Sequence, residues 1–129
     1  MINFDVLYKQ QIMEHYRSPR NKGVLENAEI DFFELNPLCG DEIRLTMKLN
    51  GGRVKDVKFD GRGCAISQSS ASLMTEEFKE KTLDELMKIS QEDVLRKLGI
   101  NVGPGRLKCV LLILKALQRG IFLHEKSKN

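Results

Sequence analysis

The 129-residue sequence contains no tryptophan, and only 6% of its residues are aromatic. Proteins that hold single-stranded nucleic acid stack its bases on aromatic side chains, and this chain has few residues for such a surface. Its net charge is only +3, because 21 basic residues are interspersed with 18 acidic ones. The sequence lacks the concentrated basic charge that is typical of nucleic-acid binding, and we expect no nucleic-acid partner.

Long apolar runs are also missing. The longest, residues 110–114, is followed by Lys115 and is far shorter than the roughly 20 residues that cross a bilayer. Residues 1–5 lack the basic and apolar regions of a secretory signal. An odd number of cysteines without such a signal favours thiols that stay reduced. We therefore expect a cytoplasmic protein with no membrane partner.

Length and composition indicate one domain over residues 1–129, since 41% hydrophobic residues can form a single core. Apolar side chains occupy every second position from 43 to 49, the pattern of a half-buried strand. Asn50-Gly51-Gly52 predicts a tight turn into a second strand, and a third is expected around residues 30–35. One face of these three antiparallel strands needs a cover of helices.

Helical patterns supply that cover. Residues 4–16 and 67–80 have apolar residues at helical spacing, and Thr82 with Glu85 has the signature of a capping box. Ser90 begins a further helix, and residues 106–119 form the last one. We therefore predict an α+β fold, with a three-stranded antiparallel sheet, helices packed on one face and an N-terminal helix.

Three cysteines and one aspartate carry the strongest functional signal. Cys39 and Asp41 lie in the segment Asn-Pro-Leu-Cys-Gly-Asp, which has the turn residues of a loop between two strands. Cys64 follows Gly-Arg-Gly just before a predicted helix, and Cys109 lies near the start of the last helix. Three thiolates and one carboxylate make a tetrahedral set for zinc, or an unequal set for an iron–sulfur cluster.

Separate buried thiols are the alternative. Free cysteine is often buried as a small hydrophobic residue, and the 24 and 44 residues between successive cysteines match no short zinc motif. The local contexts favour one shared site instead. Arg106 and Lys108 are cations beside Cys109, and a helix begins after Cys64; both features favour thiolates. We predict that Arg106 and Lys108 support the metal ligands.

Histidine is scarce, with only two in the chain. His15 lies near the C-terminal end of the first predicted helix. It could be a metal ligand, but we expect a cationic side chain that interacts with the helix dipole.

Several segments together resemble the iron–sulfur cluster scaffold family of IscU, SufU and the NifU N-terminal domain. In chain order they are residues 7–8 with 15–21, residues 36–41, residues 61–67 continued by 69–74, and residues 106–109. The resemblance implies the fold predicted above, with Cys39, Asp41, Cys64 and Cys109 as ligands of zinc or of a transient [2Fe–2S] cluster. It also implies a cysteine desulfurase as sulfur donor and apo iron–sulfur proteins as acceptors.

Two positions depart from the IscU pattern. IscU-type members usually carry a histidine directly before the third cysteine and a Leu-Pro-Pro-Val-Lys chaperone-recognition segment upstream. This chain has Lys108 at the first position and Gly103-Pro104-Gly105 at the second, as SufU-type members do. The spacing between the last two cysteines is IscU-like, so the branch stays open. The changed segment argues against recognition by a dedicated Hsp70-type chaperone.

Three functions are compatible with these residues. The first is a scaffold that accepts sulfur and iron, assembles a transient cluster and passes it to acceptor proteins. The second is zinc-dependent transfer of persulfide sulfur from a cysteine desulfurase. The third is a zinc-stabilised structural module, and Asp41 argues against it because structural zinc sites are normally built from cysteine and histidine.

We expect the first function, and therefore a carrier rather than an enzyme. Under the second, the protein would be a zinc-dependent sulfurtransferase. Resemblance to SufU favours Cys39 as the persulfide acceptor, and resemblance to IscU favours Cys109. The missing histidine before Cys109 favours zinc in the isolated protein.

Overall fold

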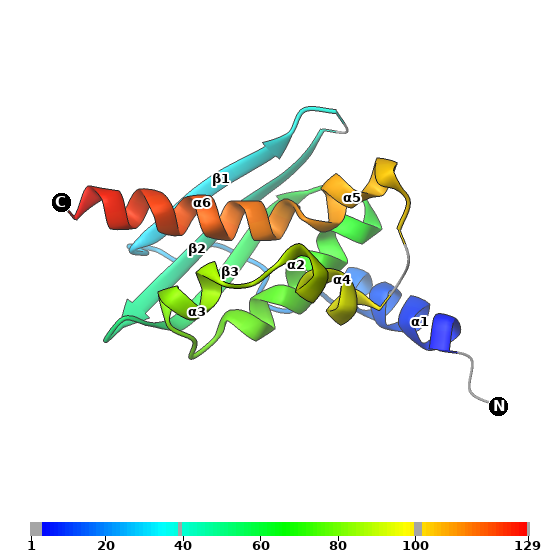
Figure 1. Ribbon diagram of the computed structural model, residues 1–129, viewed down its shortest axis with the longest axis horizontal. Helices are drawn as coiled ribbons and strands as arrows, with labels where there is room; N and C mark the ends of the chain where they lie inside the picture. Colours follow the sequence, from blue (N-terminus) through cyan, green and yellow to red (C-terminus); the bar gives the residue numbers. More distant parts are fainter. Residues whose placement is uncertain (1–3, 39, 100–101, 129) are drawn as a thin grey trace.

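The computed structural model describes residues 4–38, 40–99 and 102–128 of the chain. The elements in chain order are α1 (Phe4–Arg17), β1 (Ile30–Asn36), β2 (Asp41–Asn50), β3 (Arg53–Arg62), α2 (Ala65–Phe78), α3 (Leu83–Met87), α4 (Gln91–Leu98), α5 (Pro104–Val110) and α6 (Leu112–Ser127). Figure 1 shows α6 crossing the strands at an angle, and it packs on β1 and β2. The architecture confirms the predicted α+β class. None of the helices in these ranges combines the length and the apolar character needed to cross a bilayer.

The sheet is antiparallel, in the order β1-β2-β3. On its inner face Leu45 of β2 lies opposite Phe32 of β1 and Phe59 of β3. Gly51 and Gly52 form the predicted turn between β2 and β3, with φ angles of 61° and 78°. Both angles are positive, as a type I′ hairpin turn requires. The fully or almost fully buried side chains of the inner face are Ile30, Ile43, Leu45, Met47, Val57 and Phe59.

The outer face is less open than the alternation predicted. Thr46 is only 1% exposed, although it alternates with the buried residues of β2. The segment between α1 and β1 crosses it: the Leu25 N–H donates to the Thr46 hydroxyl, which donates to the Lys58 carbonyl (3.0 and 3.2 Å). This long-range cover has no local signal in the sequence of β2.

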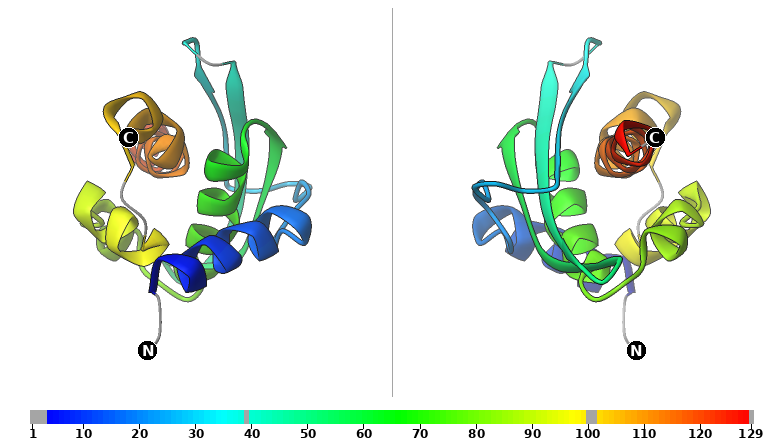
Figure 2. Two further views of the ribbon diagram at one scale, coloured as in Figure 1. Left: turned by 90° about the vertical axis from the view of Figure 1, so that its right-hand side faces the viewer. Right: turned by 90° about the vertical axis from the view of Figure 1, so that its left-hand side faces the viewer.

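Helices α2 and α6 cover the inner face. Helix α6 packs on β1 and β2, α2 packs on β3, and α1 packs on α2. Figure 2 shows α2 and α6 on the same side of the sheet in both end-on views. The capping box predicted with Thr82 and Glu85 is present at the start of α3, and the helix start predicted at Ser90 also has a capping box, formed with Asp93.

Helix α2 is buried despite its polar sequence. Its buried polar residues are Ser67, Gln68, Ser69, Ser70, Ser72 and Thr75. The Ser69 hydroxyl donates to the Ile12 carbonyl of α1 (2.6 Å), and the Ser70 hydroxyl donates to the Val110 carbonyl of α5 (2.7 Å). Small side chains whose hydroxyls are hydrogen-bonded therefore let α1 and α5 pack closely on α2.

The single last helix predicted over residues 106–119 is wrong. The structure has two helices, α5 and α6, which meet at Leu111, and the second continues to Ser127. The break directly follows the Val110 carbonyl that accepts from Ser70. A side chain that bonds to a carbonyl of the helical hydrogen-bond ladder is a recognised cause of helix kinks. The break places Cys109 at the end of a short helix that is separate from α6.

Candidate metal centre

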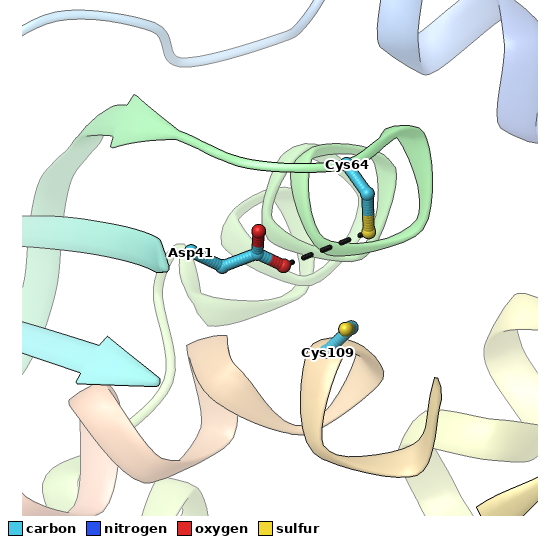
Figure 3. A group of neighbouring side chains, drawn as sticks. All are labelled: Asp41, Cys64 and Cys109. Carbon is cyan, nitrogen blue, oxygen red and sulfur yellow. Dashed lines mark hydrogen bonds between the residues drawn. The ribbon is translucent and has the colours of Figure 1, made fainter. Parts of the chain in front are cut away.

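Three of the four predicted ligands lie together at one end of the sheet. The ligand atoms of Asp41, Cys64 and Cys109 are all within 4.8 Å of one another. They come from the first residue of β2, the residue before α2 and helix α5, three segments far apart in the sequence (Figure 3). Cys39, the fourth predicted ligand, lies outside the described residues, two positions before Asp41.

A direct contact joins two of these side chains. The Cys64 thiol donates to Oδ2 of Asp41 at 3.6 Å, and Figure 3 shows Cys109 facing this pair from α5. Cys64 is also the N-cap of α2, because its sulfur accepts from the Ser67 N–H at 3.5 Å. Asp41 and Cys109 are 5% and 6% exposed, whereas Cys64 is half-buried. The sulfur of Cys64 thus lies between a carboxylate and the positive end of a helix.

One pair of these ligand atoms has the separation that a tetrahedral metal ion requires. Zinc–sulfur and zinc–oxygen bonds of about 2.3 and 2.1 Å place sulfur and oxygen ligands about 3.6 Å apart, and two sulfurs about 3.8 Å apart. The distance between Cys64 Sγ and Asp41 Oδ2 is 3.6 Å. The thiols of Cys64 and Cys109 are also the donor type that holds iron–sulfur clusters. The residues present therefore fit either group.

Asn36 organises the connection that carries Cys39. It pairs with Asp41 at the last position of the β1–β2 ladder. Its backbone carbonyl accepts from the Gly40 N–H at 2.8 Å, and its side-chain oxygen accepts from the Leu38 N–H at 3.2 Å. Asn36 therefore ties both sequence neighbours of Cys39. Sequence reasoning assigned it no role, although an asparagine before proline is typical of such turns.

Gly63 makes room for Asp41. A Cβ atom at position 63 would lie 2.8 Å from Cγ of Asp41 and 2.4 Å from the Ser67 hydroxyl oxygen. Side chains do not approach so closely, so with any residue other than glycine at position 63 the Asp41 carboxylate and the Ser67 hydroxyl would have to shift. The glycine before Cys64 thus has a steric reason that the sequence alone does not reveal.

Lys22 fixes the same connection from the other side. Its ammonium group donates to the Gly61 carbonyl at 3.2 Å and to the side-chain oxygen of Gln68 at 3.3 Å. It also lies 3.7 Å from the carboxylate of Asp60 and 5.1 Å from the centre of the Phe59 ring. These contacts join the residues on both sides of Cys64 to the segment that follows α1.

The two predicted supporting cations lie at the surface. Arg106 and Lys108 are both exposed on α5, and Lys108 lines a groove beside the site. Their action on the Cys109 sulfur stays a prediction.

His15 has a different role from the one predicted. Its Nε2 accepts from the Arg20 guanidinium at 3.1 Å, because a guanidinium can only donate, and its Nδ1–H therefore donates to the Ser72 hydroxyl at 2.7 Å. Burial, and then the Arg20 charge, lower the pKa of His15 below its usual value. The expected cationic contact with the helix dipole is therefore wrong, and the neutral ring joins α1 to α2.

The fold and the cysteine–carboxylate cluster together define a small α+β domain with a metal-binding type of site at one end of its sheet. Residues 7–129 match the NifU-like N terminal domain, and the chain belongs to that family. This confirms the resemblance identified from its motifs.

Named relatives come from both branches of the family. A Bacillus subtilis (strain 168) protein named zinc-dependent sulfurtransferase SufU is 41% identical over 140 aligned residues, which cover 95% of each chain. The Thermotoga maritima iron–sulfur cluster assembly scaffold protein IscU is 38% identical to this chain. The alignment covers 85% of this chain and 78% of the Thermotoga protein. The crystal structure of FiSufU from Fervidobacterium islandicum AW-1 superposes with a TM-score of 0.77 at 31% identity, over 90% of this chain and 97% of that one.

Proposed function

We propose that this protein is an iron–sulfur cluster assembly scaffold, which accepts sulfur from a cysteine desulfurase together with iron and passes the assembled cluster to acceptor proteins. The observation that carries the proposal is the gathering of Asp41, Cys64 and Cys109 within 4.8 Å of one another. The relatives named as scaffolds support it. Cys39, two residues before Asp41 in the sequence, completes the proposed ligand set.

Sulfur delivery needs a thiolate that a partner protein can reach. The thiolate attacks the outer sulfur of the donor's persulfide, so that a new sulfur–sulfur bond forms, the old one breaks and the donor thiolate leaves. Cys109 is 6% exposed, whereas Leu38, the neighbour of Cys39, is 77% exposed. The burial of Cys109 supports a role as a holding ligand, and the resemblance to SufU favours Cys39 as the acceptor.

Asp41 is the ligand that we expect to leave first. A carboxylate is a harder ligand than a thiolate and prefers other metals to soft iron–sulfur or zinc–thiolate centres. Bound metal would keep the cysteines deprotonated, and its binding displaces the proton that Cys64 donates to Asp41. Release of the carboxylate would then open one position for an incoming thiol.

Zinc-dependent sulfur transfer is the second candidate. It is supported by the 41% identity to the zinc-dependent sulfurtransferase SufU over 95% of both chains. Lys108 in place of the IscU-type histidine also supports it. In this function zinc is a resident cofactor of the cysteines, and the protein is an enzyme rather than a carrier. Both candidates use one domain over residues 1–129, a cysteine desulfurase partner and a cytoplasmic setting.

Two assays on one preparation separate these functions. In the first, the zinc-loaded protein is added to a cysteine desulfurase with cysteine and reductant but no iron, and sulfide release is measured. In the second, ferrous iron is added without oxygen, and cluster formation and transfer to an apo-ferredoxin are followed by absorbance and circular dichroism. Cluster transfer without strong stimulation supports the scaffold, and strong stimulation without iron supports sulfur transfer.

Matched variants keep the outcome interpretable. Cys64→Ser should abolish whichever of the two activities the wild-type protein shows. Leu123→Asp, at an exposed position on α6, should leave that activity intact. A protein that neither stimulates the desulfurase nor forms a transferable cluster would contradict both candidates.

A further inference from the structure

A groove adjoins the candidate site on the side of α6. It has a volume of about 560 Å³ and lies between the β1–β2 connection, the α3–α4 junction and the start of α6. Leu38 and Lys108, the sequence neighbours of Cys39 and Cys109, both line it. Whatever occupies the groove therefore contacts the sequence neighbours of two predicted ligands.

One wall of the groove is apolar and open to solvent. Leu38, on the β1–β2 connection, is 77% exposed, and Leu35, near the end of β1, is 45% exposed. The half-buried side chains of Ile89 and Leu111 face the groove from the opposite elements. Strand β1 is also an edge strand of the sheet, and its last two residues, Leu35 and Asn36, line the groove. Such an edge suits an extended polypeptide.

The charges of the groove have one sign. Lys108 and Lys115 line it, and the described lining residues include no carboxylate. Lys115 pairs with the buried carboxylate of Glu34, at 3.7 Å, but Arg119 pairs with the same carboxylate, at 3.3 Å. Two cations on one buried carboxylate leave positive charge for a ligand.

We propose that this groove binds an extended segment of a partner protein that carries leucine-like side chains together with carboxylates. The apolar wall takes the aliphatic side chains, and Lys108 and Lys115 pair with the carboxylates. The partner would thereby be held against the cysteine site, and only this last step rests on the proposed function. A second copy of the chain is the competing occupant, and the experiment below distinguishes it from a partner segment.

Gln91 offers a place where the charge of the groove can be changed in either direction. It is exposed, lines the groove and is the first residue of α4, directly after the Ser90 cap. A carboxylate at this position is favourable to the helix dipole, so Gln91→Glu should fold at least as well as the native chain. Gln91→Lys gives the opposite charge at the same place.

The test is fluorescence anisotropy with a labelled eight-residue peptide in which leucine alternates with aspartate. A peptide with lysine in place of aspartate is the control ligand. We expect the acidic peptide to bind and the lysine peptide to bind at least tenfold more weakly. Gln91→Glu and Lys115→Gln should each weaken the acidic peptide by about two- to fivefold, as for exposed ion pairs, and Gln91→Lys should strengthen it. Leu38→Asp should weaken it by tenfold or more, and Leu123→Asp, outside the groove, should not.

Equal binding of the two peptides, no binding of the acidic one, or equal effects of Leu38→Asp and Leu123→Asp would overturn the proposal. A wild-type dimer that Leu38→Asp dissociates in sedimentation would assign the groove to a second copy and also overturn it. Zinc content and desulfurase stimulation are measured on the same variants. Their failure while the acidic peptide still binds would count against the proposed function and not against the groove.

Discussion

Gly63→Ala tests the steric reason for the glycine before Cys64. The added methyl carbon would lie 2.8 Å from Cγ of Asp41, whereas ordinary contacts begin at 3.4 Å. The carboxylate or the β3–α2 connection must therefore move by about 0.6 Å, and the 2.4 Å approach to the Ser67 hydroxyl adds to the displacement. Changing a residue that orients a metal ligand usually costs about 10- to 100-fold in affinity, or about 1.4 to 2.8 kcal/mol.

The assay is zinc affinity, measured by competition with a chromophoric chelator, alongside the unfolding free energy of the zinc-free protein. If the methyl group acts through the carboxylate, Gly63→Ala should cost much less in an Asp41→Ala background, since that variant has no carboxylate to displace. Ser67→Ala is the matched control for the remaining contact. Zinc affinity of Gly63→Ala within twofold of wild type, or the same loss with and without Asp41, would refute the reasoning.

Three further predictions concern the metal ligands, the metal itself and His15. Asp41→Ala should remain loaded with zinc at micromolar concentrations but transfer sulfur or cluster more slowly. Cys→Ser at Cys39, Cys64 or Cys109 should instead weaken metal binding itself. Equal transfer rates for wild type and Asp41→Ala at equal metal loading would mean that Asp41 only stabilises the turn. Chelation of zinc should lower the melting temperature without abolishing cooperative unfolding, because the sheet and helices bury a core of their own; complete unfolding on chelation at room temperature would favour a structural zinc module. Burial lowers the pKa of His15 below 6.5, so as the pH falls the His15 ring is protonated in the unfolded chain before it is protonated in the folded protein. The contribution of His15 to stability is therefore fully present above about pH 6.5 and is lost as the pH falls. The unfolding free energy of wild type should therefore fall more between pH 7.5 and pH 5.5 than that of His15→Gln, and parallel pH profiles would contradict the assignment.

The sequence predicts the sheet well because its signals are local. The alternation around Leu45 and the glycine pair at 51–52 determine the central hairpin within some 20 residues, and the caps at Thr82 and Ser90 mark helix starts by their own side chains. These features depend on neighbours in the chain, and the structure confirms them.

Features that depend on distant contacts could not be predicted in this way. The apolar pattern of the last helix runs through Leu111 without a break, because the break follows a bond from Ser70, 40 residues earlier. The alternation of β2 predicts an exposed side chain at Thr46, and it is buried because the segment that contains Leu25 crosses the outer face of the sheet. His15 reads as a helix-end cation, and its neutral state comes from burial and from Arg20 and Ser72.

The candidate site shows both kinds of signal. Turn and glycine contexts singled out Cys64 and Cys109 as ligands, and the structure brings their sulfurs and a carboxylate oxygen of Asp41 within 4.8 Å. The steric role of Gly63 beside Asp41 and the contacts of Lys22 had no recognisable signal, because the partners of both residues lie elsewhere in the chain.

X-ray absorption at the zinc edge of the protein loaded with one equivalent of zinc tests the central claim most directly. The account predicts a first shell of three sulfurs near 2.3 Å and one oxygen near 2.0 to 2.2 Å. Cys109→Ser should lower the sulfur count to two, and Asp41→Ala should change only the oxygen contribution. A wild-type shell dominated by nitrogen or oxygen, or one that Cys64→Ser and Cys109→Ser leave unchanged, would contradict a shared site of three cysteines and Asp41.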